Sequence, residues 1–431
     1  MKIPSELHLP SRGNGVPEFL NKLFRYAVDI AGPESSLPPH LPEPPAGRTL
    51  VVAIGKAAAS MARVFEENWP EGASLTGIAL TRYDHGLLCK RIEVVEASHP
   101  VPDDRGHAMT RKIMNDVAQL TADDLLVFLV SGGGSALMAM PADGISLDEK
   151  KRINKALLMS GAPIGEMNIV RKHLSAVKGG RLAVLAAPAR VMTLAISDVP
   201  GDDPSTIASG PTVADASTRS DALTILAKYK IELSKQLRNC LESELTETPK
   251  ADHPVFANCR YEIITCPADV LDVVASALKE QGISVANLGA QIEGEARDVA
   301  IGHAGLALTK SSSADIILSG GETTVTISDD SIPGKGGRNC EYLLALTIAL
   351  DGAEGIYALA ADTDGIDGSE TNAGAVITPD TLARGSALGM DAKDFLERHD
   401  SFAYFETLGD LVTTGPTRTN VNDFRVIWVN R

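Results

Sequence analysis

The chain has 431 residues, a formal net charge of -16 and five cysteines. This length exceeds what one hydrophobic core usually supports, so two α/β domains are expected. The acidic balance argues against nucleic acid as a partner, and no apolar run approaches the length of a membrane span. Residues 1–6 lack the apolar core of a secretory signal. The cysteines are scattered without zinc-ligand spacing, which favours reduced thiols in a cytoplasmic protein over a disulfide framework.

An amphipathic helix is predicted near residues 17–31, before a Pro-rich connector. Short apolar runs then alternate with Gly-rich or polar turns and helical stretches, a pattern typical of buried parallel strands in βαβ units. The strands predicted in the first half are 49–54, 75–80, 92–96, 124–130 and 190–196. The helices predicted between them are 57–69, 104–120, 147–160 and 166–185. This alternation indicates a Rossmann-like, doubly wound parallel sheet.

A mostly helical and charged segment, 215–260, indicates a domain boundary. The expected domains are therefore 1–245 and 255–431. In the second half, a smaller C-terminal α/β domain is predicted from strands at 261–265, 283–287, 314–319, 356–361 and 424–429. Ligands of open α/β sheets bind beyond the carboxyl ends of the strands, so the turns that follow strands are the places to seek a site.

Two such turns in the first half favour an anionic ligand. Gly55 and Lys56 follow strand 49–54 at the start of a helix, where an ammonium group and free backbone N–H groups can bind an anion. A solvated lysine at a helix start is the alternative. The turn after strand 124–130 consists of Ser131, Gly132, Gly133, Gly134 and Ser135. Its glycines let backbone amides approach a phosphate, although a merely flexible loop has the same composition.

Two further turns combine charges with glycine. Asp198 follows strand 190–196, and a carboxylate at a strand end is typical of a magnesium site, although Asx turns explain the neighbouring aspartates equally well. Glu322 follows strand 314–319. Beyond it, Lys335 and Arg338 lie in a Gly-rich stretch that opens a helix, and arginine suits bidentate binding of phosphate or carboxylate.

One predicted helix carries a polar, cationic face. Asn168, Arg171, Ser175 and Lys178 are spaced three, four and three residues apart, which places them on the same side of a helix. Ordinary solvated surface remains an alternative. The turn 362–368 has several aspartates, but their spacing does not match an EF-hand, which leaves a magnesium-linked or a structural turn.

Several well-known motifs are absent from the sequence. There is no G-x-x-x-x-G-K-[ST], so the chain is not a P-loop nucleotide binder, and the protein-kinase motifs are missing as well. No G-x-G-x-x-G follows the first strand, which weakens a nicotinamide-dehydrogenase interpretation. The residues alone therefore predict an α/β enzyme that binds anionic, phosphorylated ligands, and they leave its substrate open.

Ten stretches, read in order, resemble the glycerate 2-kinase family with a MOFRL-type C-terminal domain. They are 54–58, 98–103, 131–137 (SGGGSAL), 168–182 (NIVRKHLSAVKGGRL), 196–211 (ISDVPGDDPSTIASGP), 294–300, 319–324 (SGGETT), 334–339 (GKGGRN), 362–368 and 415–423 (GPTRTNVND). Each stretch is a weak signal alone. Together they run from about residue 50 to the C-terminus, which makes the resemblance specific.

The resemblance implies a two-domain enzyme, with its active site in a cleft between the domains, that converts D-glycerate and ATP into 2-phosphoglycerate and ADP with Mg²⁺. The catalytic lysine and arginine of the family map onto Lys56 and Arg338, which also bind substrate. We assign Asn168 and Arg171 to substrate binding. The loop 131–135 and Lys335 are assigned to the nucleotide phosphates, and Asp198 and Glu322 to the metal. A monomer or homodimer is expected, and the general base stays open.

Two positions depart from the family pattern. Cys340 stands where the family generally carries Gln, and Arg418 replaces the glycine usual in Gly-Pro-Thr-Gly-Thr-Asn. Arg418 is hypothesised to alter the preference among acids. Two other functions compete with the kinase: an NAD(P)H-dependent hydroxypyruvate reductase, weakened by the missing dinucleotide fingerprint, and a non-catalytic regulator that binds a sugar acid or a nucleotide.

Overall fold

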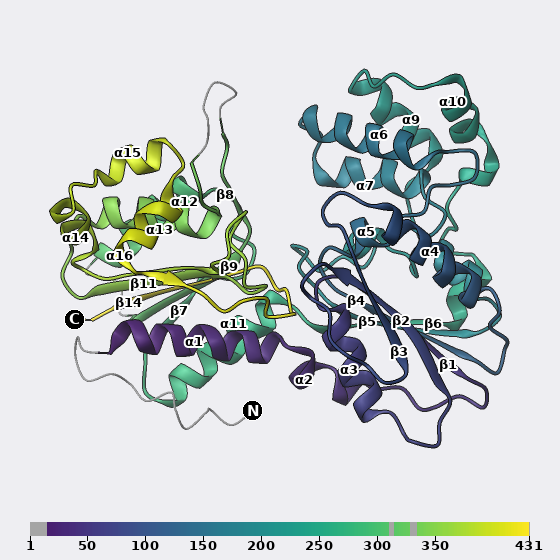
Figure 1. Ribbon diagram of the computed structural model, residues 1–431, viewed down its shortest axis with the longest axis horizontal. Helices are drawn as coiled ribbons and strands as arrows, with labels where there is room; N and C mark the ends of the chain where they lie inside the picture. Colours follow the sequence, from purple (N-terminus) through teal and green to yellow (C-terminus); the bar gives the residue numbers. More distant parts are fainter. Residues whose placement is uncertain (1–14, 310–313, 328–333, 431) are drawn as a thin grey trace. The chain divides into compact units, whose positions relative to one another are not determined.

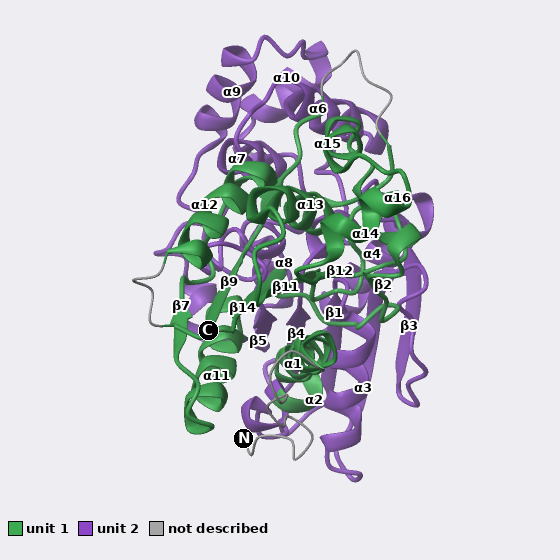
Figure 2. Cartoon of the chain, turned by 90° about the vertical axis from the view of Figure 1, so that its left-hand side faces the viewer, with its two compact units in different colours: residues 1–35, 265–431 green, residues 36–264 purple. Residues whose placement is uncertain are grey.

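The computed structural model describes residues 15–309, 314–327 and 334–430, so the N-terminal stretch 1–6 lies outside the described residues. The chain divides into two compact units, one formed by residues 36–264 and the other by residues 1–35 and 265–431 (Figure 2). All five cysteines are free thiols. Within the described ranges, no helix combines the length and the apolar character needed to cross a membrane.

The unit 36–264 is built on a sheet with the strand order β3-β2-β1-β4-β5-β6 (Figure 1). Its strands are β1 (Thr49–Ile54), β2 (Leu75–Arg82), β3 (Ile92–Ala97), β4 (Leu125–Val130), β5 (Arg190–Ile196) and β6 (Cys259–Thr265). All pairs from β3 to β5 are parallel. Every residue of β1 and β4 is buried, as expected of apolar strands in the middle of a parallel sheet. The predicted Rossmann-like sheet is confirmed.

Two groups of helices belong to this unit. Those in contact with the sheet include α3 (Ala58–Asn68), α4 (Asp104–Val117) and α8 (Arg181–Ala186). A second group packs around an apolar core of its own, which includes Leu157, Val170 and Leu226, and its members lie together in Figure 1. They are α6 (Leu147–Met159), α7 (Ile164–His173), α9 (Arg219–Lys228) and α10 (Lys235–Glu242).

The helix predicted over 166–185 is broken. Helix α7 ends at His173 and the next helix, α8, begins at Arg181. Between them Gly179 and Gly180 adopt positive φ angles, which glycine tolerates and a continuing helix does not. The prediction that Ser175 and Lys178 share a helix face with Asn168 and Arg171 is therefore wrong.

The other unit has a mixed sheet with the strand order β13-β12-β11-β14-β9-β7. Its strands are β7 (Val285–Asn287), β9 (Ile316–Gly321), β11 (Ile356–Asp362), β12 (Gly374–Ile377), β13 (Leu411–Val412) and β14 (Asp423–Val429), and β8 (Gly294–Glu295) pairs separately with β10 (Thr323–Thr324). Strands β7 and β9 are parallel, and the other pairs of this sheet are antiparallel. The sequence did not predict the short strands β8, β10, β12 and β13.

The helices of this unit lie on both faces of its sheet in Figure 1. They are α1 (Val16–Ala31), α11 (Pro267–Glu280), α12 (Ala296–Leu308), α13 (Arg338–Leu350), α14 (Thr381–Ala387), α15 (Ala392–Glu397) and α16 (Ser401–Leu408). Helix α1 contacts α11 and β11, and the ring of Phe19 lies 5.3 Å from that of Trp428.

The observed division differs from the predicted domains in two respects. The amino-terminal helix α1 was predicted in the first domain, but its buried apolar face belongs to the unit that contains the C-terminal strand. Strand β6 was predicted in the second half, but it lies at the edge of the first sheet beside β5. The first unit consequently extends to residue 264, beyond the boundary expected at 245–255.

Candidate functional site

Two of the turns singled out in the sequence meet at the carboxyl edge of the parallel sheet, where the strand order reverses between β1 and β4. Such a switch point is where open α/β sheets bind ligands. The backbone N–H of Lys56 donates to the carbonyl of Gly132 at 2.8 Å, and that of Ala57 donates to Ser131 Oγ at 3.0 Å. Gly55 has a φ of 115°, and a β-carbon there would collide with Ser131, so the close approach of the two turns requires glycine.

Lys56 lies beside the Gly-rich loop. Gly133 has a φ of 82°, and a β-carbon at this residue would lie 2.9 Å from His99 Nε2 and 3.6 Å from Lys56 Cγ. Helix α5 (Gly134–Leu137) begins directly after it. The side chain of Lys56 is thus next to the loop that was predicted to bind phosphate.

A pocket of about 930 Å³ is lined by this loop and by helices α6 and α7. The Nζ of Lys178, whose residue is 2% exposed, donates to the carbonyl and hydroxyl oxygens of Ser135 at 2.7 and 2.9 Å. The Oδ1 of Asn168 accepts from Arg171 at 3.4 Å and from the hydroxyl of Ser209 at 3.5 Å. The structure therefore brings Ser135 of α5 near Asn168 and Arg171 of α7, with Ser209 between them.

Lys150 is a further cation of this pocket that the sequence did not reveal. It lies in α6 within the run Asp-Glu-Lys-Lys-Arg, which has the composition of a solvated surface. Burial, with Arg171 and Arg181 nearby, lowers the pKa of Lys150 to about 7. Burial also lowers the pKa of Lys178, with Lys150 and Arg171 adding to the effect. Cations held close together in this way favour an anionic ligand.

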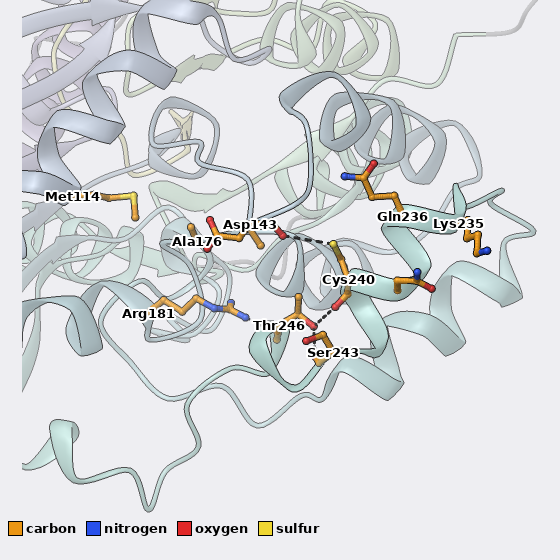
Figure 3. Close-up of a pocket in the computed structure, with 11 residues that line it drawn as sticks. Met114, Asp143, Ala176, Arg181, Lys235, Gln236, Cys240, Ser243 and Thr246 are labelled. Atoms are coloured by element: carbon orange, nitrogen blue, oxygen red, sulfur yellow. Dashed lines mark hydrogen bonds between the residues drawn. The ribbon is translucent and has the colours of Figure 1, made fainter.

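A second pocket, of about 820 Å³, lies elsewhere in the same unit (Figure 3). Its arginine, Arg181, donates to the backbone carbonyls of Lys172 and Thr246. The thiol of Cys240 donates to the carbonyl of Asp143 at 3.5 Å. None of the residues predicted for the active site lines it. The pocket beside the Gly-rich loop is consequently the better candidate for the chemistry.

In the other unit, Arg338 forms the centre of a cluster of carboxylates. Its Nε and Nη2 lie 2.8 Å from Asp423 and Asp362, and its Nη1 lies 2.9 Å from Glu322. Antiparallel pairing places Asp362 of β11 opposite Asp423 of β14, which explains why their side chains meet. Burial opposes the charge of Arg338, but Asp423, Asp362 and Glu322 outweigh it and raise the pKa of the guanidinium.

The turn 362–368 fixes the start of helix α13, of which Arg338 is the first residue. The Asp367 carboxylate accepts from the backbone N–H groups of Asn339 and Cys340, each at 2.9 Å. A carboxylate at this place satisfies amides that the helix leaves unpaired. Of the two interpretations left open for this turn, these contacts support the structural one. The buried thiol of Cys340 accepts from Asn372 Nδ2 at 3.2 Å.

The remaining predicted site residues are Lys335 and the two proposed metal ligands, Asp198 and Glu322. Lys335 is exposed, with its Nζ 3.5 Å from Glu370 and near the ring of Phe402. Asp198 and Glu322 belong to different units. In the part of the chain that the structure describes, no three or more His, Cys, Asp or Glu side chains gather as a metal site.

The α/β fold, the cationic pocket at the switch point of its parallel sheet and the cluster around Arg338 are typical of an enzyme. The model of the "MOFRL family" matches residues 315–423, and that of a "Domain of unknown function (DUF4147)" matches residues 19–242. The chain is 38% identical to the D-glycerate 2-kinase of Thermotoga maritima, over 94% of this chain and 98% of that protein. It is also 48% identical to a putative hydroxypyruvate reductase of Agrobacterium vitis, over 96% and 94% of the two chains.

A solved structure leads to the same family. The crystal structure of glycerate kinase from Thermotoga maritima superimposes with a TM-score of 0.86 at 36% identity, over 96% of this chain and all of that one. The chain therefore belongs to the glycerate 2-kinase family with a MOFRL domain, and as a member of this family it is a kinase.

Proposed function

We propose that the protein transfers the γ-phosphoryl group of ATP to the 2-hydroxyl of D-glycerate, which yields 2-phosphoglycerate and ADP. The similarity to the Thermotoga maritima D-glycerate 2-kinase over nearly the full length of both chains carries this proposal. The motifs of the resemblance occupy the turns at the candidate site. We also propose that the reaction takes place in the cytoplasm and that the enzyme acts as a monomer or homodimer.

In the proposed reaction the 2-hydroxyl oxygen forms a bond to the γ-phosphorus, the bond from that phosphorus to the bridging oxygen of ADP breaks, and the hydroxyl proton leaves. Lys56 and Arg338 stabilise the charge on the transferring group, which is the main catalytic demand of phosphoryl transfer. Because Lys56 and Arg338 belong to different units, both units must supply a residue.

Other residues bind the substrates in this proposal. The loop 131–135 and Lys335 contact phosphate groups. Asn168 and Arg171 bind an anionic substrate; this role is supported by the place of Arg171 in the lining of the pocket and by its contact with Asn168.

Magnesium would reach the site with the nucleotide. Glu322, already paired with Arg338, and Asp198 are the proposed protein ligands. A site with so few carboxylates fits an ion held mainly by phosphate oxygens and water, which is usual for Mg²⁺. When bound, the ion would neutralise charge on the phosphates.

The name of the Agrobacterium relatives raises the alternative of a hydroxypyruvate reductase. The turn between β1 and α3 reads Gly-Lys-Ala and not G-x-G-x-x-G. In this structure that turn is fixed against the Gly-rich loop, with Lys56 beside Gly133. A lysine at this point suits a phosphate group better than it explains hydride transfer.

The test is purified protein with D-glycerate, MgATP and enolase, followed by the ultraviolet absorbance of phosphoenolpyruvate. Absorbance without added phosphoglycerate mutase is the expected result and requires 2-phosphoglycerate as the product. Absorbance only with the mutase would mean that the product is 3-phosphoglycerate, so that the 3-hydroxyl and not the 2-hydroxyl is phosphorylated. Lys56→Ala should abolish the signal. If neither absorbance nor ADP appears, oxidation of NADH in the presence of hydroxypyruvate would identify the protein as the reductase.

A further inference from the structure

Six cationic residues line the pocket beside the Gly-rich loop: Lys150, Lys151, Arg152, Lys155, Arg171 and Lys178. Burial lowers the pKa of three of them, Lys150, Arg171 and Lys178. Each has its polar contacts with neutral groups. Lys178 binds the oxygens of Ser135, Lys150 donates to the carbonyl of Met140 at 3.3 Å, and Arg171 Nε donates to Asn154 Oδ1 at 2.6 Å.

Among the described residues, none of these three cations forms an ion pair with a carboxylate within 4.0 Å, although Asp148 also lines the pocket. The contrast with nearby Lys172 is informative, because that buried lysine pairs with Asp215 at 3.1 Å. Desolvated like charges without a counter-ion are unfavourable, so a pocket that holds them is arranged for an anionic ligand. The hydroxyls of Ser135 and Ser209, 2.9 Å apart, add neutral polar groups beside them.

Size and charge distinguish the two anionic substrates. Glycerate is a small acid with a single carboxylate, whereas the triphosphate of ATP carries several negative charges along a chain. The pocket volume of about 930 Å³ lies at the upper end of the range of roughly 300–1,000 Å³ typical of sites for drug-sized ligands. Glycerate would leave most of this volume empty.

The wall of the pocket also has an apolar part, beside polar residues such as His99 and Asn154. Val101 and Leu158 line it and are 61% and 67% exposed, and Leu147 lies on the same helix as Leu158. Exposed apolar side chains beside a cationic centre match the two halves of a nucleotide, a base with apolar faces and a charged phosphate chain.

We propose that this pocket is the nucleotide site, with Lys150, Arg171 and Lys178 on the phosphate chain and the apolar wall at Val101 and Leu158 on the base. The inference rests on the proposed function for the identity of the nucleotide as ATP or ADP. It assigns Arg171 to the nucleotide and adds Lys150 and Lys178, to which the family resemblance assigned no role. Lys56 lies next to Gly133, which lines the pocket, so the γ-phosphoryl group would be transferred on this side of it.

The experiment measures ADP binding to the full chain by calorimetry, without glycerate. Lys150→Met and Lys178→Met should each weaken binding about tenfold or more, because each removes a charge-assisted contact. The matched control is Lys228→Met in the same unit, whose lysine is 55% exposed and pairs with Glu166 on the surface. This control should leave the dissociation constant for ADP unchanged.

A second readout separates binding from folding. Without ligand, Lys150→Met should melt at the same temperature as the parent protein or higher, because it removes a desolvated charge. The rise in melting temperature that ADP causes in the parent protein should shrink or vanish in this variant. If Lys178→Met fails to fold, Lys150→Met still decides the question.

Unchanged ADP affinity in a folded Lys150→Met would overturn the inference. A raised KM for glycerate with normal ADP affinity would also overturn it and make this the acid site. Failure of the proposed function has a different signature: the protein would bind ADP through Lys150 and Lys178 and yet form no phosphoenolpyruvate in the coupled assay.

Discussion

Arg338 offers the sharpest test at the scale of a single residue. Its guanidinium reaches Asp423, Asp362 and Glu322 with separate nitrogens, which the single ammonium of lysine cannot reproduce. We expect Arg338→Lys to lower kcat by roughly 10²–10³-fold, the usual effect of losing one preorganised donor to the reacting group. The coupled assay at saturating ATP and glycerate measures this change.

The control for this variant is Arg398→Lys in the same unit. Arg398 pairs with Asp394 at 3.0 Å and its side chain is 52% exposed, so its replacement should leave kcat unchanged. Lysine keeps the positive charge among the buried carboxylates, so Arg338→Lys should remain folded by thermal melting. A folded Arg338→Lys with the kcat of the parent protein would refute the catalytic assignment.

Arg418 shows why the family usually has glycine at its position. The residue adopts a φ of 61°, in the left-handed region that favours glycine. We expect Arg418→Gly to raise the free energy of unfolding by up to about 1 kcal/mol, since the gain in the folded state is partly offset by the freedom of glycine in the unfolded chain. Urea denaturation measures it.

Arg418→Ala is the matched comparison, because it removes the same side chain and keeps a β-carbon at positive φ. It should not gain stability. The same two variants test the hypothesised effect on acid preference. If the ratio of rates for glycerate and a longer 2-hydroxy acid stays unchanged in both, that hypothesis is wrong.

At the scale of elements, the ten predicted strands are all present because each is an apolar run of strand length bounded by turn residues. The short strands were missed because two to four residues carry no periodic signal. The break after His173 was not predicted, because the helical spacing of the polar residues suggested one continuous helix across Gly179 and Gly180.

Only part of the candidate site could be predicted from the sequence, because local patterns do not report which distant strands and helices come together. Lys56 and the loop 131–135 follow buried strands directly, so a parallel sheet alone brings them together. Asp362 and Asp423 meet through antiparallel pairing of β11 with β14, and no local pattern reports such a pairing. Lys150 belongs to a charged helix whose burial comes from other helices of its unit.

Glu247 connects several elements of the unit 36–264 and predicts a pH dependence. Its carboxylate accepts from Lys250 Nζ at 2.7 Å, from the backbone of Arg219 at 3.2 Å and from His173 at 3.3 Å. Burial alone would raise the pKa of Glu247, but these donors together with the backbone N–H of Thr248 lower it to about 2, from an ordinary value of 4.5. The ionised carboxylate therefore stabilises the fold above pH 4.5, and this contribution is lost as the pH falls towards 2.

Glu247→Gln should accordingly lower the free energy of unfolding at pH 7 and flatten its decline between pH 4.5 and 2.5. Urea denaturation at several pH values measures both effects. Glu406→Gln, at an exposed position of the other unit, is the control and should reproduce the parent profile. A Glu247→Gln profile parallel to that of the parent protein would show that other carboxylates carry the acid sensitivity.

For the molecule as a whole, two properties bear on function: the net charge and the way in which the chain is divided between the two units. A net charge of -16 repels anionic substrates at long range, so the enzyme gathers cations locally, in the pocket beside the Gly-rich loop. The unit 36–264 is continuous in sequence, whereas the other unit joins residues 1–35 to 265–431. The pocket beside the Gly-rich loop is lined entirely by the continuous unit.

The division predicts how the chain behaves when it is cut. Residues 36–264 expressed alone should fold, because the unit has its own sheet and cores, and should bind ADP with an affinity close to that of the full chain. They should not phosphorylate glycerate, because Arg338 is absent.

Residues 265–431 alone should aggregate, because without α1 the aromatic faces of Phe424 and Trp428 lose their partners Phe24 and Phe19. Joining residues 15–35 to 265–431 through a Gly/Ser linker should restore a monodisperse protein in size-exclusion chromatography. If the 36–264 fragment is folded by circular dichroism but does not bind ADP in calorimetry, residues of the other unit must take part in holding the nucleotide.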